Sequence, residues 1–90
     1  MRLVWSAMAR NDRLRIMTVV AQDNPAAAVA LDEAFRDKAR RAARTPRLYK
    51  PGRCIETHEI VVMPNYVMIY QVQEDEVEIL RILHARQQWP

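Results

Sequence analysis

The chain has 90 residues, 50% of them hydrophobic, a formal net charge of +3 and a single cysteine, Cys54. This length allows one small domain over residues 1–90, and the lone cysteine excludes an internal disulfide framework and is typical of a reducing compartment. No run of residues resembles a signal peptide or approaches the length of a membrane span, so we expect a soluble protein of the cytoplasm.

The N-terminal segment is predicted to form one short strand and a first helix. Residues 2–5 are short and apolar enough for a strand, and Ser6 follows where a helix N-cap belongs, because its hydroxyl can satisfy amide groups of the first turn. Apolar residues recur at helical spacing behind it: Leu14, Met17 and Ala21, widened by Ile16 and Val20.

A second helix is predicted to begin after Asp23, since Asn24 is a good cap and Pro25 suits the first helical position. It should end near Arg44, because Thr45-Pro46 disfavours its continuation. Its apolar stripe consists of Ala28, Leu31, Phe35, Ala39 and Ala42. The residues that we expect to be buried against a sheet are Leu14, Met17, Leu31 and Phe35.

The last third of the chain is predicted to be a three-stranded antiparallel meander. Residues 58–63, 66–72 and 77–83 are rich in β-branched and aromatic residues, and turn signals separate them at Pro64-Asn65 and Glu74-Asp75-Glu76. Each run is apolar on both alternating faces, so the strands should be mostly covered. The sequence therefore predicts an α+β fold of order β-α-α-β-β-β, an antiparallel sheet with a two-helix hairpin on one face and the other face partly open.

Positive charge is concentrated between the second helix and the meander. Residues 36–53 contain one carboxylate, Asp37, beside these basic residues: Arg36, Lys38, Arg40, Arg41, Arg44, Arg47, Lys50 and Arg53. Such a block is typical either of a surface for nucleic acid or an acidic protein segment, or of a solvated helix face that keeps a small protein soluble. For the arginines of the predicted helix alone, we slightly favour the interpretation as a solvated helix face over that as a binding surface.

Several kinds of chemistry are excluded by residue type and spacing. A single glycine, Gly52, rules out a phosphate-binding loop, and neither a metal-ligand spacing nor a serine nucleophile elbow is present, so no cofactor or metal is expected. What remains is a set of cationic and imidazole groups that a meander could bring together: Arg53, His58, Arg81, His84 and Arg86.

This set has a chemical meaning in RNA cleavage, where attack of a 2′-hydroxyl on its phosphate needs a base, an acid and cations. His58 or His84 could transfer the protons, and Arg53, Arg81 or Arg86 could stabilise the charge. The alternative is a hydrogen-bonded structural histidine in a strand and solvated arginines at strand ends. From the residues alone, the alternative is favoured.

The chain resembles the RelE/ParE superfamily, the toxins of bacterial type II toxin–antitoxin modules, along nearly its whole length. The resemblance is closest to the plasmid-stabilisation branch called RelE/StbE or ParE, and it implies the same α+β fold. The segments that carry it are residues 3–7 (LVWSA), 49–53 (YKPGR), 59–62 (EIVV), 64–70 (PNYVMIY) and 77–90 (VEILRILHARQQWP).

The resemblance implies growth inhibition by one of two routes and an antitoxin as partner. RelE-like members are mRNA interferases, ribosome-dependent endoribonucleases, whereas ParE-like members poison DNA gyrase without a nuclease centre. Typical members carry Arg in place of His58, His in place of Met63, Arg in place of Val67 and Arg in place of Gln71, so this chain departs from the pattern at four positions. The function predicted first is a RelE-like endoribonuclease, and two alternatives stay open: a gyrase poison, and a weakened toxin homologue that mainly binds its antitoxin. The oligomeric state stays open as well.

Overall fold

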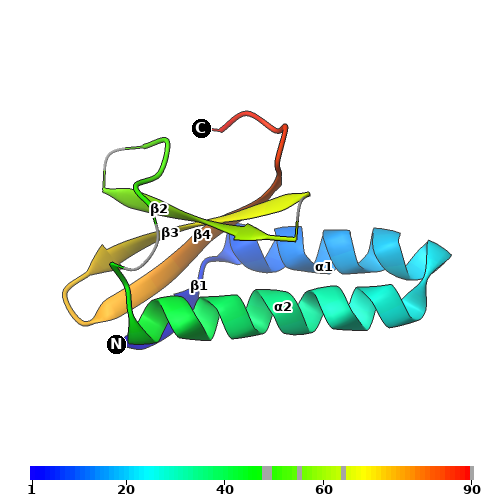
Figure 1. The fold of residues 1–90 in the computed structure, drawn as a ribbon, viewed down its shortest axis with the longest axis horizontal. Helices are drawn as coiled ribbons and strands as arrows, with labels where there is room; N and C mark the ends of the chain where they lie inside the picture. Colours follow the sequence, from blue (N-terminus) through cyan, green and yellow to red (C-terminus); the bar gives the residue numbers. More distant parts are fainter. Residues whose placement is uncertain (48–49, 55, 64, 90) are drawn as a thin grey trace.

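A two-helix hairpin packs against one face of a four-stranded sheet in the computed structural model, which describes residues 1–47, 50–54, 56–63 and 65–89 (Figure 1). The elements in chain order are β1 (Arg2–Trp5), α1 (Ala7–Asp23), α2 (Pro25–Arg44), β2 (Thr57–Val62), β3 (Tyr66–Gln73) and β4 (Glu76–His84). Neither α1 nor α2 is long and apolar enough to cross a membrane. The predicted order β-α-α-β-β-β is confirmed.

Both helices begin at the predicted caps. The Ser6 hydroxyl accepts a hydrogen bond from the Ala9 amide (3.0 Å) and donates one to the Leu80 carbonyl (2.8 Å), so it also ties α1 to β4. The Asn24 side chain accepts from the Ala27 amide (3.0 Å) and separates the two helices, while Thr45 caps the C-terminus of α2. The amide groups at the start of a helix have no hydrogen-bond partner within the helix, and polar side chains at the cap positions supply one.

The sheet has the strand order β1-β4-β3-β2. The meander β2-β3-β4 is antiparallel as predicted, and β1 adds to the outer edge of β4 in parallel, so the complete sheet is mixed. Between Ile69 and Tyr70 the pairing with β4 shifts, which leaves Leu80 as the extra residue of a bulge. In the turn predicted at Pro64-Asn65, Pro64 lies outside the described residues, as do Tyr49 and Pro90 of the segments that resemble known toxins.

The main core lies between the helices and the sheet. Leu31 and Phe35 are buried in it as predicted, and Met17 packs against it while partly exposed. The prediction for Leu14 was wrong, because its side chain is 68% exposed. The inner face of α1 is set by Asp12 and Ile16, each two residues from Leu14; at 3.6 residues per turn, Leu14 therefore lies on the opposite side of the helix.

A second, smaller cluster covers the sheet face turned away from the helices. Val67, Ile69 and Leu83 are buried there, with Leu80 and Trp89 packed against them. Figure 1 shows the C-terminal segment and residues 50–54, shortly before β2, on this side of the sheet. The outer face is therefore less open than the sequence predicted, since the end of the chain folds back over it.

Candidate functional site

The C-terminal tail, residues 85–89, turns back across the outer face of the sheet. The turn is fixed by hydrogen bonds from the Ala85 amide to the Asn65 carbonyl (2.7 Å) and from the Gln87 amide to the His84 carbonyl (2.8 Å). Trp89 then packs against the apolar cluster that contains Val67. The partly buried indole covers apolar side chains of this face together with Leu80, and this contact helps to fix the path of the tail.

Arg53 joins the tail to the connection before β2. Its Nη1 donates to the Gln87 carbonyl (3.0 Å), and its Nε and backbone amide both donate to Glu59 Oε2 (2.9 and 2.8 Å). The hydrogen bond from Arg53 lowers the pKa of Glu59 against the opposing effect of burial, so this carboxylate stays ionised. The neighbouring Gly52 is required for this path, because a Cβ there would collide with Thr57 Oγ1.

A shallow hollow of about 510 Å³, here named the tail pocket, opens between these segments; it is lined by Arg53, Ala85, Arg86, Gln87, Gln88 and Trp89. Arg86 is exposed, and its side chain makes no hydrogen bond or ion pair with any described residue. The pocket therefore offers guanidinium, amide and indole groups. None of these groups exchanges a proton near neutral pH, so the pocket is suited to binding and not to proton transfer.

The two histidines lie far apart. In the pairing register His58 of β2 faces Tyr70 of β3, and His84 of β4 faces Tyr66 at the other end of the same strand. Four residues of strand separate these positions by about 13 Å, and the two histidines are also two strand spacings, about 10 Å, apart. One phosphate cannot contact both imidazoles.

Each imidazole packs on a tyrosine ring. His58 stacks on Tyr70 with ring centroids 5.0 Å apart, and His84 meets the edge of Tyr66 at 5.9 Å. The alternation along the strands places both histidines on the face that also carries Ile60 and Ile82, which is the face that the helices cover. His84 is exposed at the end of its strand, and its Nδ1 accepts a hydrogen bond from the Arg86 amide (3.3 Å).

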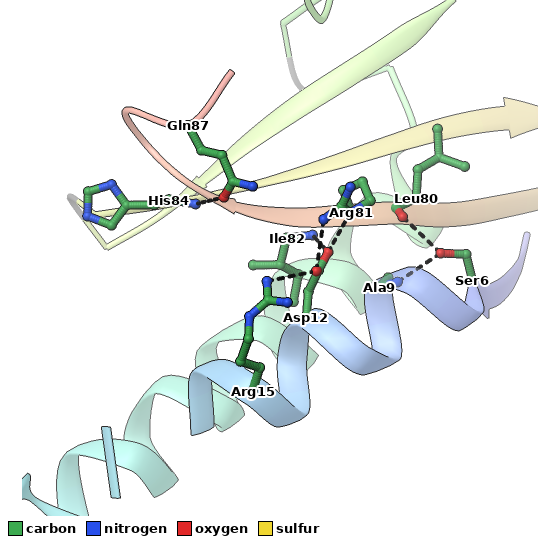
Figure 2. A network of polar contacts seen from close by, with 9 residues as sticks. All are labelled: Ser6, Ala9, Asp12, Arg15, Leu80, Arg81, Ile82, His84 and Gln87. Atoms are coloured by element: carbon green, nitrogen blue, oxygen red, sulfur yellow. Dashed lines mark hydrogen bonds and ion pairs between the residues drawn. The ribbon is translucent and has the colours of Figure 1, made fainter. Parts of the chain in front are cut away.

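Arg81 forms an ion pair with Asp12 of α1, as Figure 2 shows. Its Nε and Nη2 donate to the two carboxylate oxygens at 2.7 and 3.0 Å, the Ile82 amide donates to Oδ2 at 3.0 Å, and Arg15 approaches Oδ1 at 3.1 Å. Burial by itself would raise the pKa of Asp12. The hydrogen bonds from Arg81 and the Ile82 amide outweigh it, and the pKa of Asp12 is lowered.

The five residues singled out in the sequence are thus not brought to one place. Arg53 and Arg86 share the tail pocket, while His84 precedes the tail with its ring on the other face of the sheet, and His58 and Arg81 lie elsewhere. The sequence interpretation missed Gln87 and Trp89 as parts of a surface and Asp12 as the partner of Arg81. For Asp12 a signal existed, because a carboxylate stands in line with Ala9, Ile16 and Val20 on the inner face of α1.

Comparisons with known proteins agree on one kind of protein. Residues 3–89 match the family model described as "ParE toxin of type II toxin-antitoxin system, parDE". A Sinorhizobium fredii protein named "Putative toxin Y4kP" is 32% identical over 90 residues, which cover 99% of this chain and 93% of that protein.

Solved structures are similar in fold. A chain of the chromosomal ParDE system from P. aeruginosa superposes with a TM-score of 0.82 at 17% identity, over 93% of this chain and 95% of that chain. A YoeB/ParE toxin from Agrobacterium tumefaciens gives a TM-score of 0.69 at 20% identity, over 93% of this chain and 98% of that chain. At these identities the structural likeness shows the fold, and the family rests on the sequence matches.

Proposed function

The chain belongs to the ParE toxin family of type II toxin–antitoxin systems, and from this premise we propose that it stops growth by binding DNA gyrase through the tail pocket, without cleaving RNA. The observation that carries the proposal is the chemistry of the pocket, whose lining holds Arg53, Arg86, Gln87 and Trp89 and, among the described residues, no carboxylate or imidazole. Tryptophan and arginine are the side chains that most often dominate the binding energy of protein interfaces.

The separation of the histidines also favours a contact mechanism. A nuclease that moves two protons at one phosphate needs its acid and base within hydrogen-bond reach of the same group. His58 and His84 pair with positions four residues apart on β3, and Arg81 is held by Asp12. A poison that acts by contact needs none of these groups at its binding surface.

An antitoxin is the second partner that membership of a toxin–antitoxin family implies. We propose that an acidic, partly disordered antitoxin segment folds onto the helical hairpin. A hollow of about 500 Å³ between the helices is lined by Met17, Ala21, Ala28 and Val29, among others, and the Val29 side chain is 59% exposed. Burial of an amphipathic helix here would cover that apolar surface. Co-purification should fail for Val29→Glu and persist for Asp37→Asn, because Asp37 is exposed on the same helix and lies outside this hollow.

The main test is a supercoiling and DNA-cleavage assay with purified gyrase and toxin. Wild-type toxin should inhibit supercoiling, and Arg86→Ala or Trp89→Ala should raise the required concentration at least about tenfold, the effect of losing roughly 1.4 kcal/mol of binding. Arg10→Ala is the matched control, since Arg10 is exposed on α1 and lies outside the tail pocket. Unimpeded gyrase at saturating toxin would refute the proposal.

The alternative is a ribosome-dependent endoribonuclease, and the contact between the Arg86 amide and His84 Nδ1 favours it. In that case Arg53 and Arg86 would act from the tail pocket, and His84, which packs on Tyr66 on the other face of the sheet, would have to turn toward them. Primer extension on ribosome-bound mRNA would then show codon-aligned cuts, weakened about 10²–10³-fold by Arg86→Ala. A weakened homologue that only binds its antitoxin would be silent in both assays.

A further inference from the structure

We propose that α2 carries a second binding surface, a stripe of arginines that grips the phosphate backbone of duplex DNA without reading its sequence. The arginine stripe consists of Arg36, Arg40 and Arg44, with Arg47 directly beyond the helix. This inference goes beyond the proposed function and does not depend on which target the tail pocket binds.

The stripe lies on the side of α2 that faces away from the core. The buried residues of the helix include Leu31, Phe35 and Ala39. At about 100° per residue, Arg40 and Arg44 are turned about 140–180° from Phe35, and both side chains are exposed. Successive arginines are four residues apart, which is about 6 Å along a helix axis. Each step also turns about 40° round the axis, so the helix presents an inclined row of guanidinium groups to solvent.

The positive charge of the stripe is largely uncompensated. The sequence holds no carboxylate between Asp37 and Glu56, and among the described residues only Arg36 of the stripe lies near one, 3.7 Å from Asp37. The Met1 nitrogen lies at the same end of α2, where it donates to the Ala43 carbonyl at 3.3 Å.

Arginines elsewhere in the molecule are mostly paired. Those with a carboxylate partner at 2.6–3.1 Å are Arg2, Arg13, Arg15, Arg53 and Arg81. Paired arginines stabilise the fold or the tail, whereas an unpaired row raises the local potential and attracts a polyanion. The stripe therefore differs from these five paired arginines, and the arginines outside it that are unpaired in the described part of the chain, Arg10, Arg41 and Arg86, do not form a second row of this kind.

Duplex DNA fits this surface better than the other polyanions. Guanidinium forks match phosphate oxygens, and duplex DNA offers one phosphate charge per 1.7 Å of axis. Single-stranded RNA is held by stacking on aromatic rings, but Phe35, the one aromatic residue of α2, is fully buried. An acidic peptide that folds on binding needs apolar anchors, and within α2 the only large apolar side chain exposed is Val29, before the stripe.

Fluorescence anisotropy with a labelled 20-base-pair duplex and the purified full chain tests the proposal. The variant Arg40→Gln/Arg44→Gln keeps good helix formers and removes two charges from the stripe. The control, Arg10→Gln, removes one charge from an exposed position of α1 that has no carboxylate partner among the described residues, and the single variant Arg40→Gln matches it in charge. Circular dichroism verifies that all three variants keep the fold.

Wild type and control should bind the duplex with a steep salt dependence. In the stripe variant the slope of log K against log salt should become shallower by about 1.8, because each lost phosphate contact removes about 0.9. Binding should not depend on the base sequence of the duplex. Equal weakening by Arg40→Gln and Arg10→Gln would overturn the proposal, since it would reflect net charge alone. Tighter binding of single-stranded RNA or of polyglutamate than of the duplex would overturn it as well.

Discussion

Asp12 shows how one charged side chain fixes the place of a helix against the edge of a sheet. β1 pairs with β4 only as far as Ile79, and beyond this point the Ile82 amide would lack a strand partner on that side. The Asp12 carboxylate accepts this amide and both donors of Arg81 (Figure 2). An acceptor on α1 thus completes the edge of β4, and the orientation of α1 follows from it.

The residue-scale prediction concerns this ion pair. Asp12→Asn should lower the free energy of unfolding by about 3–5 kcal/mol, because it leaves the mostly buried Arg81 without its counter-charge. Urea denaturation measures the loss. Asp37→Asn is the control, since the side chain of Asp37 is 69% exposed, and it should change stability by no more than about 0.5 kcal/mol. Equal stability of the two variants would show that the pair contributes nothing.

The same carboxylate predicts a dependence of stability on pH. The pKa values of Asp12 and Glu59 are lowered in the folded protein, so the unfolded chain binds protons more readily. The stability they contribute is complete above their unfolded pKa values near 4 and is lost as the pH falls through the lower folded values. Asp12→Asn should therefore flatten the fall between about pH 5 and pH 2 in urea titrations. An unchanged acid profile would argue against this linkage.

At the scale of elements, the two helices differ in how clearly their sequences mark the inner face. α2 has an uninterrupted stripe of alanines with Leu31 and Phe35, and every residue predicted on it is buried. In α1 the inner face contains the carboxylate of Asp12, while Leu14 is exposed on the other side. A hydrophobic pattern locates the inner face only where polar side chains stay outside it.

A pair of truncations tests this difference between the helices. Phe35→Ala should cost about 3–5 kcal/mol, because the ring is fully buried and meets the edge of Tyr66 at 5.8 Å. Leu14→Ala should cost less than about 0.5 kcal/mol, since its side chain is mostly in water. Urea midpoints of the two variants measure both values. A Phe35→Ala variant as stable as the parent would contradict the packing described above.

At the scale of the whole molecule, the tail both closes the fold and forms the proposed binding surface. Arg53 holds the Gln87 carbonyl, and Trp89 covers the outer cluster of Val67, Ile69 and Leu83. Arg53, Gln87 and Trp89 also line the tail pocket. A partner that binds the pocket therefore contacts a segment whose position depends on the outer face of the sheet.

Removal of the tail should separate these two roles. A chain that ends at Arg86 should keep its helices by circular dichroism, bind a fluorescent apolar dye at the uncovered cluster, and lose gyrase inhibition. Trp89→Phe is the conservative control and should retain most inhibition, because it preserves an aromatic contact. Full inhibition by the shortened chain would exclude the tail pocket as the target surface.

For the candidate site, the sequence identified some of the residues but not their grouping. Arg53 and Arg86 were predicted and do meet at the tail pocket. His58 and Arg81 were grouped with them because a meander could bring their strand regions together. In the structure, strand register separates His58 from the tail pocket and Arg81 is held in an ion pair. Register and pairing depend on residues far apart in the chain, which a local pattern does not contain.

The sequence by itself determined the element order, the caps at Ser6 and Asn24, the inner face of α2 and the family resemblance, because each of these depends on residues a few positions apart. Only the tertiary structure decided the parallel pairing of β1 with β4, the burial of Asp12 against Arg81 and the return of Trp89 over the outer face. Each of these joins segments distant in the chain. Their energies come from burial and charge pairing that exist only after the layers have packed.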